Sequence, residues 1–201
     1  MGSAAPIFSA HRGDDGLGAP TSIETARLLL RRPVAGDAAA IFARYGADPA
    51  VTRFLAWPTH RSVADAQKFL AFCDAEWDQR GVGPYLIHAR DGGELLGSAG
   101  LAMESPRQAV VGYLLARDAW GQGYATEALT AIRDLAFRLG VYRLHATCHV
   151  DNRASGRVME KCGFRRDGIL RGRAQFPNLQ PGIAADVLCY AAFFERKPRP
   201  W

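Results

Sequence analysis

The sequence has few lysines, no long apolar run and no closely spaced pair of cysteines. No apolar stretch approaches the roughly 20 residues of a membrane-spanning helix, which argues against a membrane protein. The first residues lack a basic start followed by an apolar stretch, so they do not resemble a secretory signal. We therefore expect a cytoplasmic protein without a membrane partner. Residues 1–21, rich in Gly, Ala, Ser and Pro, are expected to form a flexible leader.

The cysteines also lack the spacing of a zinc site. They stand far apart, at Cys73, Cys148, Cys162 and Cys189, each among apolar neighbours. This pattern favours buried, reduced thiols, with a disulfide or a zinc site as the alternative. His145 and His149 share one face of an expected strand, but roughly 13 Å separates them there, too far to share an ion through bonds of about 2 Å. We expect no metal.

Positive charge is present mainly as arginine. Of the 25 basic residues only three are lysine, and the formal net charge is +5. The guanidinium fork suits phosphate recognition, although a general preference for arginine would also scatter such charges over the surface. No run of Lys and Arg is longer than two residues, so we expect no nucleic-acid partner.

The 201 residues suit one domain with a substantial core. Periodicity, caps and turns predict an α/β (α+β) protein with a single mixed layer rather than a regular doubly wound sheet. The expected elements are a strand at 26–34, helices from 37 to 55 (broken at 46–49) and at 62–81, strands at 84–90, 94–103 and 109–116, a helix at 125–139, a strand at 142–150, a helix at 153–161, and strands near 164–174 and 186–194.

Two glycines, Gly121 and Gly123, stand between the apolar strand and the helix that follows it. Bare backbone at the start of a helix exposes several N–H groups to one side, and the helix dipole adds partial positive charge there. Such a turn can bind phosphate, or it can simply connect the two elements. A Walker loop would need a lysine before the helix, and a dinucleotide fingerprint would need glycine where Thr126 stands. Neither pattern fits.

The stretch "WGQGYATEAL", followed at residue 152 by "NRASGRVMEKCGF", resembles the GCN5-related N-acetyltransferase (GNAT) superfamily. Within it, the chain is most similar to the RimJ/RimL-like branch that acetylates N-termini of ribosomal proteins, with its small-molecule-acetylating relatives. The resemblance covers about residues 22–195, including the opening "IETARLLLRRP", and implies a domain over 22–195 followed by a tail at 196–201. It also implies the GNAT fold, a mixed, mostly antiparallel sheet of about seven strands flanked by about four helices.

The resemblance implies acetyl-CoA as co-substrate. Backbone N–H groups from Gln122 to Thr126 would hold its pyrophosphate, although Trp120 stands where the superfamily motif has Gln or Arg. The pantetheine arm would lie along the strand that ends near Leu115. The implied cofactor-binding residues are Tyr113, Leu114, Leu115, Trp120, Gly121, Gln122, Gly123, Tyr124, Ala125, Thr126, Asn152 and Ser155.

The implied reaction is direct attack of a primary amine on the thioester in a ternary complex. The backbone N–H of Leu115 could hold the oxyanion, and Ser155 could protonate the thiolate or merely cap its helix. Gln175 stands where the ribosomal-protein branch has a glutamate base, and an amide cannot take up a proton usefully. Glu104, a bound water or Asp186 are the alternatives, although Asp186 could instead anchor its loop.

The acceptor is expected to be a protein N-terminus or a small-molecule amine. Phe54 and Trp57 would line one wall of its groove, with Gln175 and Phe176 on the other, although core packing explains the aromatic residues equally well. The subunit is expected to be a monomer or a homodimer. The alternative function is a catalytically silent acyl-CoA-binding regulatory module on the same fold.

Overall fold

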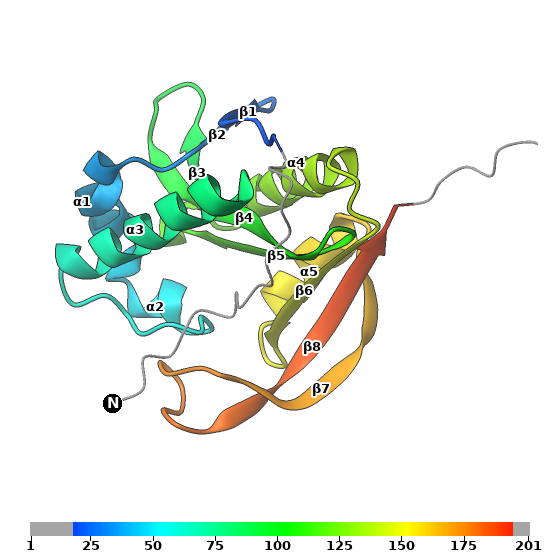
Figure 1. Cartoon of the computed structure of the whole chain (residues 1–201). Helices are drawn as coiled ribbons and strands as arrows, with labels where there is room; N and C mark the ends of the chain where they lie inside the picture. The colour runs from blue at the N-terminus through cyan, green and yellow to red at the C-terminus, as the bar shows by residue number, and fades with distance from the viewer. Residues whose placement is uncertain (1–17, 195–201) are drawn as a thin grey trace, which may run out of the picture.

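The computed structural model describes residues 18–194 as one eight-stranded sheet with helices on both faces (Figure 1). In chain order the elements are β1 (Ser22–Glu24), β2 (Leu28–Arg31), α1 (Ala38–Ile41), α2 (Pro49–Thr52), α3 (Val63–Arg80), β3 (Pro84–Ala89), β4 (Leu95–Ser105), β5 (Gln108–Leu115), α4 (Tyr124–Arg138), β6 (Arg143–His149), α5 (Arg153–Lys161), β7 (Arg165–Gln175) and β8 (Ala184–Phe193). Helices α1–α3 lie on one face of the sheet, and α4 and α5 lie on the other.

The strand order is β1-β2-β3-β4-β5-β6-β8-β7. Neighbouring strands are antiparallel except β5 and β6, which are parallel and pair only from Gln108–Arg143 to Val110–His145. Beyond Val110 the described structure records no further pairing between these two strands. The second half of β5 therefore faces an opening in the middle of the sheet. The mixed, mostly antiparallel architecture expected from the sequence is confirmed.

Local signals explain the helix limits. The Asp65 carboxylate accepts the N–H groups of Arg61 and Ser62 at the start of α3, and Gly81 ends this helix with φ at 65°, since glycine reaches positive φ without strain. On α4 the stripe of Leu129, Ile132 and Leu135 is buried in the main core, as its 3.6-residue spacing predicts.

The structure has one more strand and one more helix than expected from the sequence. The expected strand at 26–34 is preceded by a short partner, β1, because Thr25 closes a tight turn by accepting the N–H of Leu28 at its hydroxyl (3.0 Å). The expected helix at 37–55 begins with α1, continues as a π-helical segment over Phe42–Gly46 and resumes as α2, so its predicted break at 46–49 is confirmed.

Part of the expected leader contacts the domain. Ala19 donates its N–H to the carbonyl of Gly81, and the carbonyl of Pro20 accepts the hydroxyl of Tyr85. Residues 1–17 and 195–201, which include the rest of the leader and the expected tail, lie outside the described residues. All four cysteines are buried and free, as expected. Within residues 18–194, no helix is long and apolar enough to cross a bilayer.

Gly97 on β4 packs directly against β5, the strand that borders the opening. A Cβ at this position would meet the carbonyl of Leu114 and the Cα of Leu115 on β5, whereas nothing lies within 4 Å of a Cβ at Gly92 in the preceding turn. We expect Gly97→Ala to lower the free energy of unfolding by about 1–3 kcal/mol or more. The matched Gly92→Ala should stay within about 0.5 kcal/mol. Urea unfolding measures both, and equal midpoints would contradict this packing.

Candidate active site

The turn between β5 and α4 presents unpaired backbone N–H groups. Gly121 and Gly123 have φ values of 74° and 83°, which side chains rarely adopt. The first intrahelical bond of α4 runs from the N–H of Glu127 to the carbonyl of Gly123, so the N–H groups of Tyr124, Ala125 and Thr126 have no partner within the helix. The helix dipole adds positive potential at this end. The turn can therefore bind an anion.

A side-chain brace from the first hairpin holds this turn. The Glu127 carboxylate accepts the Thr25 hydroxyl (2.6 Å), the Arg27 backbone N–H (2.8 Å) and Arg27 Nε (2.7 Å), while Arg27 also donates to the carbonyl of Gln122 (2.9 Å). Burial opposes ionisation of this carboxyl, but these hydrogen bonds hold the pKa of Glu127 below 4.5. The arginine offsets the negative charge beside the anion site. Sequence reasoning missed both residues, although they lie in the segments that carry the family resemblance.

Trp120, the departure from the superfamily motif, fastens the turn to β5. Its indole N–H donates to the carbonyl of Leu115 (2.8 Å). The N–H of Ala116 bonds to Leu96 on the β4 side, and successive N–H groups of a strand point to opposite sides. The N–H of Leu115 therefore points to the opening between β5 and β6, where a sequence-based reading expected an oxyanion donor.

Ser155 lies across this opening, on the first turn of α5. The cap of this helix is Asn152, whose side-chain oxygen accepts the N–H of Ser155 (3.1 Å), so Ser155 is not itself the cap. The hydroxyl of Ser155 instead lies 2.9 Å from the hydroxyl of Tyr113, which is also 3.0 Å from the Ser155 carbonyl. Burial raises the pKa of Tyr113, so the phenol stays protonated and can donate to Ser155.

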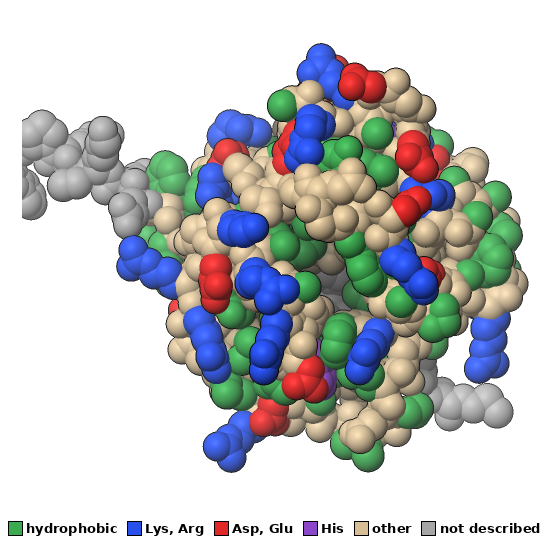
Figure 2. Space-filling model, turned by 180° about the vertical axis from the view of Figure 1, so that it is seen from behind, with side chains coloured by type: hydrophobic (Ala, Val, Ile, Leu, Met, Phe, Trp, Pro, Cys, Tyr) green, Lys and Arg blue, Asp and Glu red, His purple; other side chains and the backbone are tan. Residues whose placement is uncertain are grey.

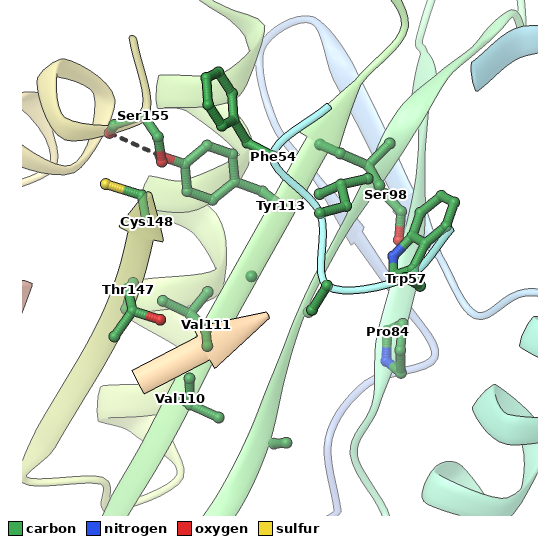
Figure 3. Close-up of a pocket in the computed structure, with 18 of the residues that line it drawn as sticks. Phe54, Trp57, Pro84, Ser98, Val110, Val111, Tyr113, Thr147, Cys148 and Ser155 are labelled. Carbon is green, nitrogen blue, oxygen red and sulfur yellow. Dashed lines mark hydrogen bonds between the residues drawn. The ribbon is translucent and has the colours of Figure 1, made fainter. Parts of the chain in front are cut away.

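A cavity of about 230 Å³ begins at this serine and extends across β5 towards β3 and α3. Figure 3 shows Tyr113, Cys148 and Ser155 at one end, and Trp57, Ser98 and Pro84 at the other. The cavity brings together seven of the residues selected from the sequence: Phe54, Trp57, Tyr113, Leu114, Asn152, Ser155 and Phe176. Cys148 also lines it, and burial raises the pKa of that thiol to about 11, so it is neutral at pH 7.

An aromatic cluster joins the two predicted walls of the groove. The His149 ring stacks on Phe54 at 5.3 Å between centroids and meets the edge of Phe176 at 4.9 Å. His149 Nδ1 accepts the backbone N–H of Asp151 (3.1 Å), so the proton of the neutral ring lies on Nε2. The alternation of β6 placed His149 on this face, but nothing in the sequence pointed to its aromatic partners.

Asn178, in the loop between β7 and β8, locks these walls together. Its side-chain oxygen accepts the N–H (2.9 Å) and hydroxyl (3.2 Å) of Thr59, and its NH₂ donates to the carbonyls of Thr52 (2.7 Å) and Trp57 (2.9 Å). All of these partners lie in or beside the segment that carries Phe54 and Trp57. Sequence reasoning missed this residue because its partners are more than 100 positions away.

Two residues expected beside the acceptor, Glu104 as a base and Gln175 in the groove wall, do not reach the cavity. Glu104 does not line it and instead contacts His145 Nε2 at 2.7 Å, near Ala109, about 13 Å along β5 from Tyr113. Gln175 is exposed at the end of β7, between Ala174 and Phe176, which do line the cavity. The strand alternation turns its side chain outward. Asp186 accepts the N–H of Gly172 (2.8 Å) and so anchors this hairpin, as one reading of the sequence expected.

Within residues 18–194 no group of three or more His, Cys, Asp or Glu side chains could hold a metal ion. The arginines are distributed around the molecule, and many form ion pairs, among them Arg31 with Asp37, Arg44 with Asp118, and Arg143 with Asp167. On the face shown in Figure 2, Lys and Arg side chains surround a central hollow rather than forming one continuous patch.

Comparison with known proteins identifies the family. A sequence profile described as the acetyltransferase (GNAT) domain matches residues 27–165. The chain belongs to the GNAT acetyltransferase family. It is 34% identical over 153 residues to the uncharacterized N-acetyltransferase YoaA of Bacillus subtilis strain 168, covering 74% of this chain and 85% of that protein. It is 27% identical to the uncharacterized N-acetyltransferase p20 of Bacillus licheniformis, covering 75% and 85%. This GNAT protein is therefore an acetyltransferase enzyme.

Solved structures agree on the fold. RimL, a ribosomal L7/L12 alpha-N-protein acetyltransferase solved in complex with coenzyme A, superposes with a TM-score of 0.74 at 26% identity, covering 86% of this chain and 97% of RimL. The microcin C7 self-immunity acetyltransferase MccE, solved with acetyl-CoA and AMP, gives a TM-score of 0.78 at 19% identity, covering 90% and 100%. The latter shows the shared GNAT fold alone.

Gly123→Glu tests the anion site. A side chain and a negative charge would enter the turn, so we expect acetyl-CoA binding to fall below detection while the protein stays folded. Gly140→Glu is the matched control, because Gly140 has a similar φ of 87° at the opposite end of α4 and open space around it. Calorimetric titration measures both affinities, and circular dichroism checks folding. Unchanged affinity in a folded Gly123→Glu protein would contradict this site.

Asn178→Ala tests whether the hydrogen bonds of Asn178 hold the two walls of the groove together. It removes both donors and both accepted bonds at a cost of about 1 kcal/mol for each net hydrogen bond, so local opening of residues 52–60 should become at least roughly tenfold more frequent. Hydrogen exchange followed by mass spectrometry measures this segment, with α4 as the internal reference. Gln180→Ala, an exposed residue of the same loop, should leave the exchange unchanged. Equal exchange in the two variants would show that Asn178 does not hold the wall.

Proposed function

We propose that the chain transfers the acetyl group of acetyl-CoA to the primary amine of an acceptor by direct attack in a ternary complex. The observation that carries the proposal is the continuity of three features. The N–H groups of residues 124–126, which have no partner within α4, form one end of a continuous binding site. The unpaired edge of β5 forms its middle, and the cavity at Ser155 forms its other end. RimL, 26% identical to this chain, is named as an acetyltransferase of a protein α-amine and was solved with coenzyme A.

The residues suit the chemical form of acetyl-CoA. Its pyrophosphate matches the N–H groups from Gln122 to Thr126, and Arg27 balances the negative charge of Glu127 beside them. The amide groups of its pantetheine arm match the backbone of β5 that faces the opening, with Asn152 at the start of α5 alongside. When bound, acetyl-CoA supplies a thioester whose carbonyl carbon an amine can attack directly.

Two groups of the chain would then act on the reaction. The Leu115 N–H, directed to the opening, would stabilise the oxyanion that forms as the new C–N bond is made. As the C–S bond breaks, the Ser155 hydroxyl would give its proton to the thiolate and take up the proton that the attacking nitrogen loses, so that coenzyme A leaves as the thiol. The hydroxyl of Tyr113, which is hydrogen-bonded to the carbonyl and the hydroxyl of Ser155, would hold the serine in place. Tyr113 thus acts through Ser155 as a positioning residue.

No free carboxylate among the described cavity residues could serve as base. Among the residues 18–194 that line the cavity, Glu76 is the only one with a carboxylate, and Arg80 holds it in an ion pair at 3.1 Å. The acceptor must therefore reach the site largely as the neutral amine. An α-amine titrates near 8 and a lysine amine near 10.4, so deprotonating lysine at neutral pH costs about 3 kcal/mol more. A weakly basic amine of the α-amine type is the acceptor we propose.

Thiol release measured with acetyl-CoA and a panel of amines tests this function. We expect turnover with α-amines and poor turnover with simple alkyl amines at pH 7. Ser155→Ala should lower kcat by a factor of about 10²–10⁴, as expected for loss of a general acid, without changing the Kd of acetyl-CoA. Binding of acetyl-CoA without turnover on any amine would instead favour the silent regulatory module. Undiminished kcat in Ser155→Ala would remove the serine from the mechanism.

A further inference from the structure

The cavity continues well beyond Ser155, to an inner end formed by other elements. Trp57 comes from the loop before α3, Phe69 and Phe72 come from α3, and Pro84 and Ser98 come from β3 and β4. Figure 3 shows Trp57, Ser98 and Pro84 grouped on the side away from Ser155. Nothing in the proposed transfer step itself uses this inner end.

Among the described residues, no Lys or Arg side chain lines the cavity, and the one carboxylate in its lining already forms an ion pair. Glu76 is bound by Arg80, and the side chains of both are largely buried, with 13% and 15% exposed. Burial lowers the pKa of His60 below 6.5, so its ring is neutral at pH 7. The Ser98 hydroxyl donates to the carbonyl of Tyr85. A carboxylate or a second ammonium group placed here would therefore be desolvated without a counter-ion, which costs several kcal/mol.

The size of the cavity limits what can enter. About 230 Å³ is available, and part of it lies at the thioester end beside Tyr113 and Ser155. A dry apolar cavity of about 150 Å³ holds one benzene ring. The inner end thus has room for one group of about this size, and its aromatic lining favours an apolar surface.

We infer that the acceptor carries an uncharged apolar group of about one aromatic ring beside its amine, and that this group occupies the inner end between Trp57, Phe69 and Pro84. This inference rests on the proposed function and names the class of its acceptor. An apolar free amine and a peptide that begins with an apolar residue share this chemistry. Free amino acids, polyamines and acidic N-termini do not.

The test compares acceptors that share an α-amine of similar basicity. kcat/KM for thiol release is measured with phenylalanine amide, glycine amide, lysine amide and aspartic acid α-amide. We expect phenylalanine amide to exceed the other three by roughly tenfold or more, the range that a hydrophobic pocket supplies. A tripeptide amide beginning with phenylalanine shows whether the source is a peptide N-terminus or a free amine. Equal or better turnover of the charged amides would overturn the inference while leaving the proposed function standing.

A variant of Trp57 tests whether the inner end of the cavity determines the selectivity among acceptor amines. Trp57→Arg places a cation there, so kcat/KM for the aspartic acid α-amide relative to phenylalanine amide should rise at least roughly tenfold. Val34→Arg, on an exposed residue outside the cavity, is the matched control and should leave the ratio unchanged. Acetyl-CoA affinity verifies that each variant is folded. If Trp57→Arg does not fold, Trp57→Ala should reduce the preference for phenylalanine amide.

An unchanged ratio in a folded Trp57→Arg protein, or an unchanged preference in Trp57→Ala, would place the selectivity elsewhere and overturn the inference. The absence of turnover on every amine, with acetyl-CoA still bound, would overturn the proposed function and this inference together.

Discussion

The short pairing between β5 and β6 is the constraint on which the site depends. These parallel strands share only the register from Gln108–Arg143 to Val110–His145 and then separate. An unpaired strand edge inside a folded sheet leaves backbone N–H and C=O groups that need partners. The separation also places the turn after β5 and the first turn of α5 on either side of one opening. The proposed binding of acetyl-CoA and the proposed protonation of its thiolate would both depend on this one interruption in the hydrogen-bond ladder.

Contacts between distant segments keep this opening in shape. The brace between Arg27 and Glu127 holds the anion turn from the first hairpin, and Trp120 attaches the same turn to the end of β5. Asn178 joins the loop between β7 and β8 to the segment before α3. An open cavity loses the packing that would otherwise fix its walls. Hydrogen bonds with specific partners replace that packing at the two ends of the site.

The composition of the cavity suits the proposed transfer, in which no carboxylate takes the proton from the amine. Gln175 stands where the resemblance implies a glutamate, and its side chain points outward, so the end of β7 supplies no carboxylate to the cavity. In the mechanism that we propose, the acceptor would arrive as the neutral amine and the walls of the cavity would orient it, since positioning alone can supply a large part of a rate enhancement. The apolar inner end and the missing base are thus two consequences of one uncharged cavity.

The sequence by itself determined the local features: the ends of α3 and α4, the strand alternation of β6, and the glycine turn that precedes α4. These features depend on neighbours within a few residues, and caps, glycine conformations and apolar spacing encode them directly. The family followed from two short motifs for the same reason. Only the tertiary structure decided that Glu104 contacts His145, that Gln175 faces outward and that Asn178 spans the groove. Those outcomes depend on which strands become neighbours and on the register between them, and no local pattern records either.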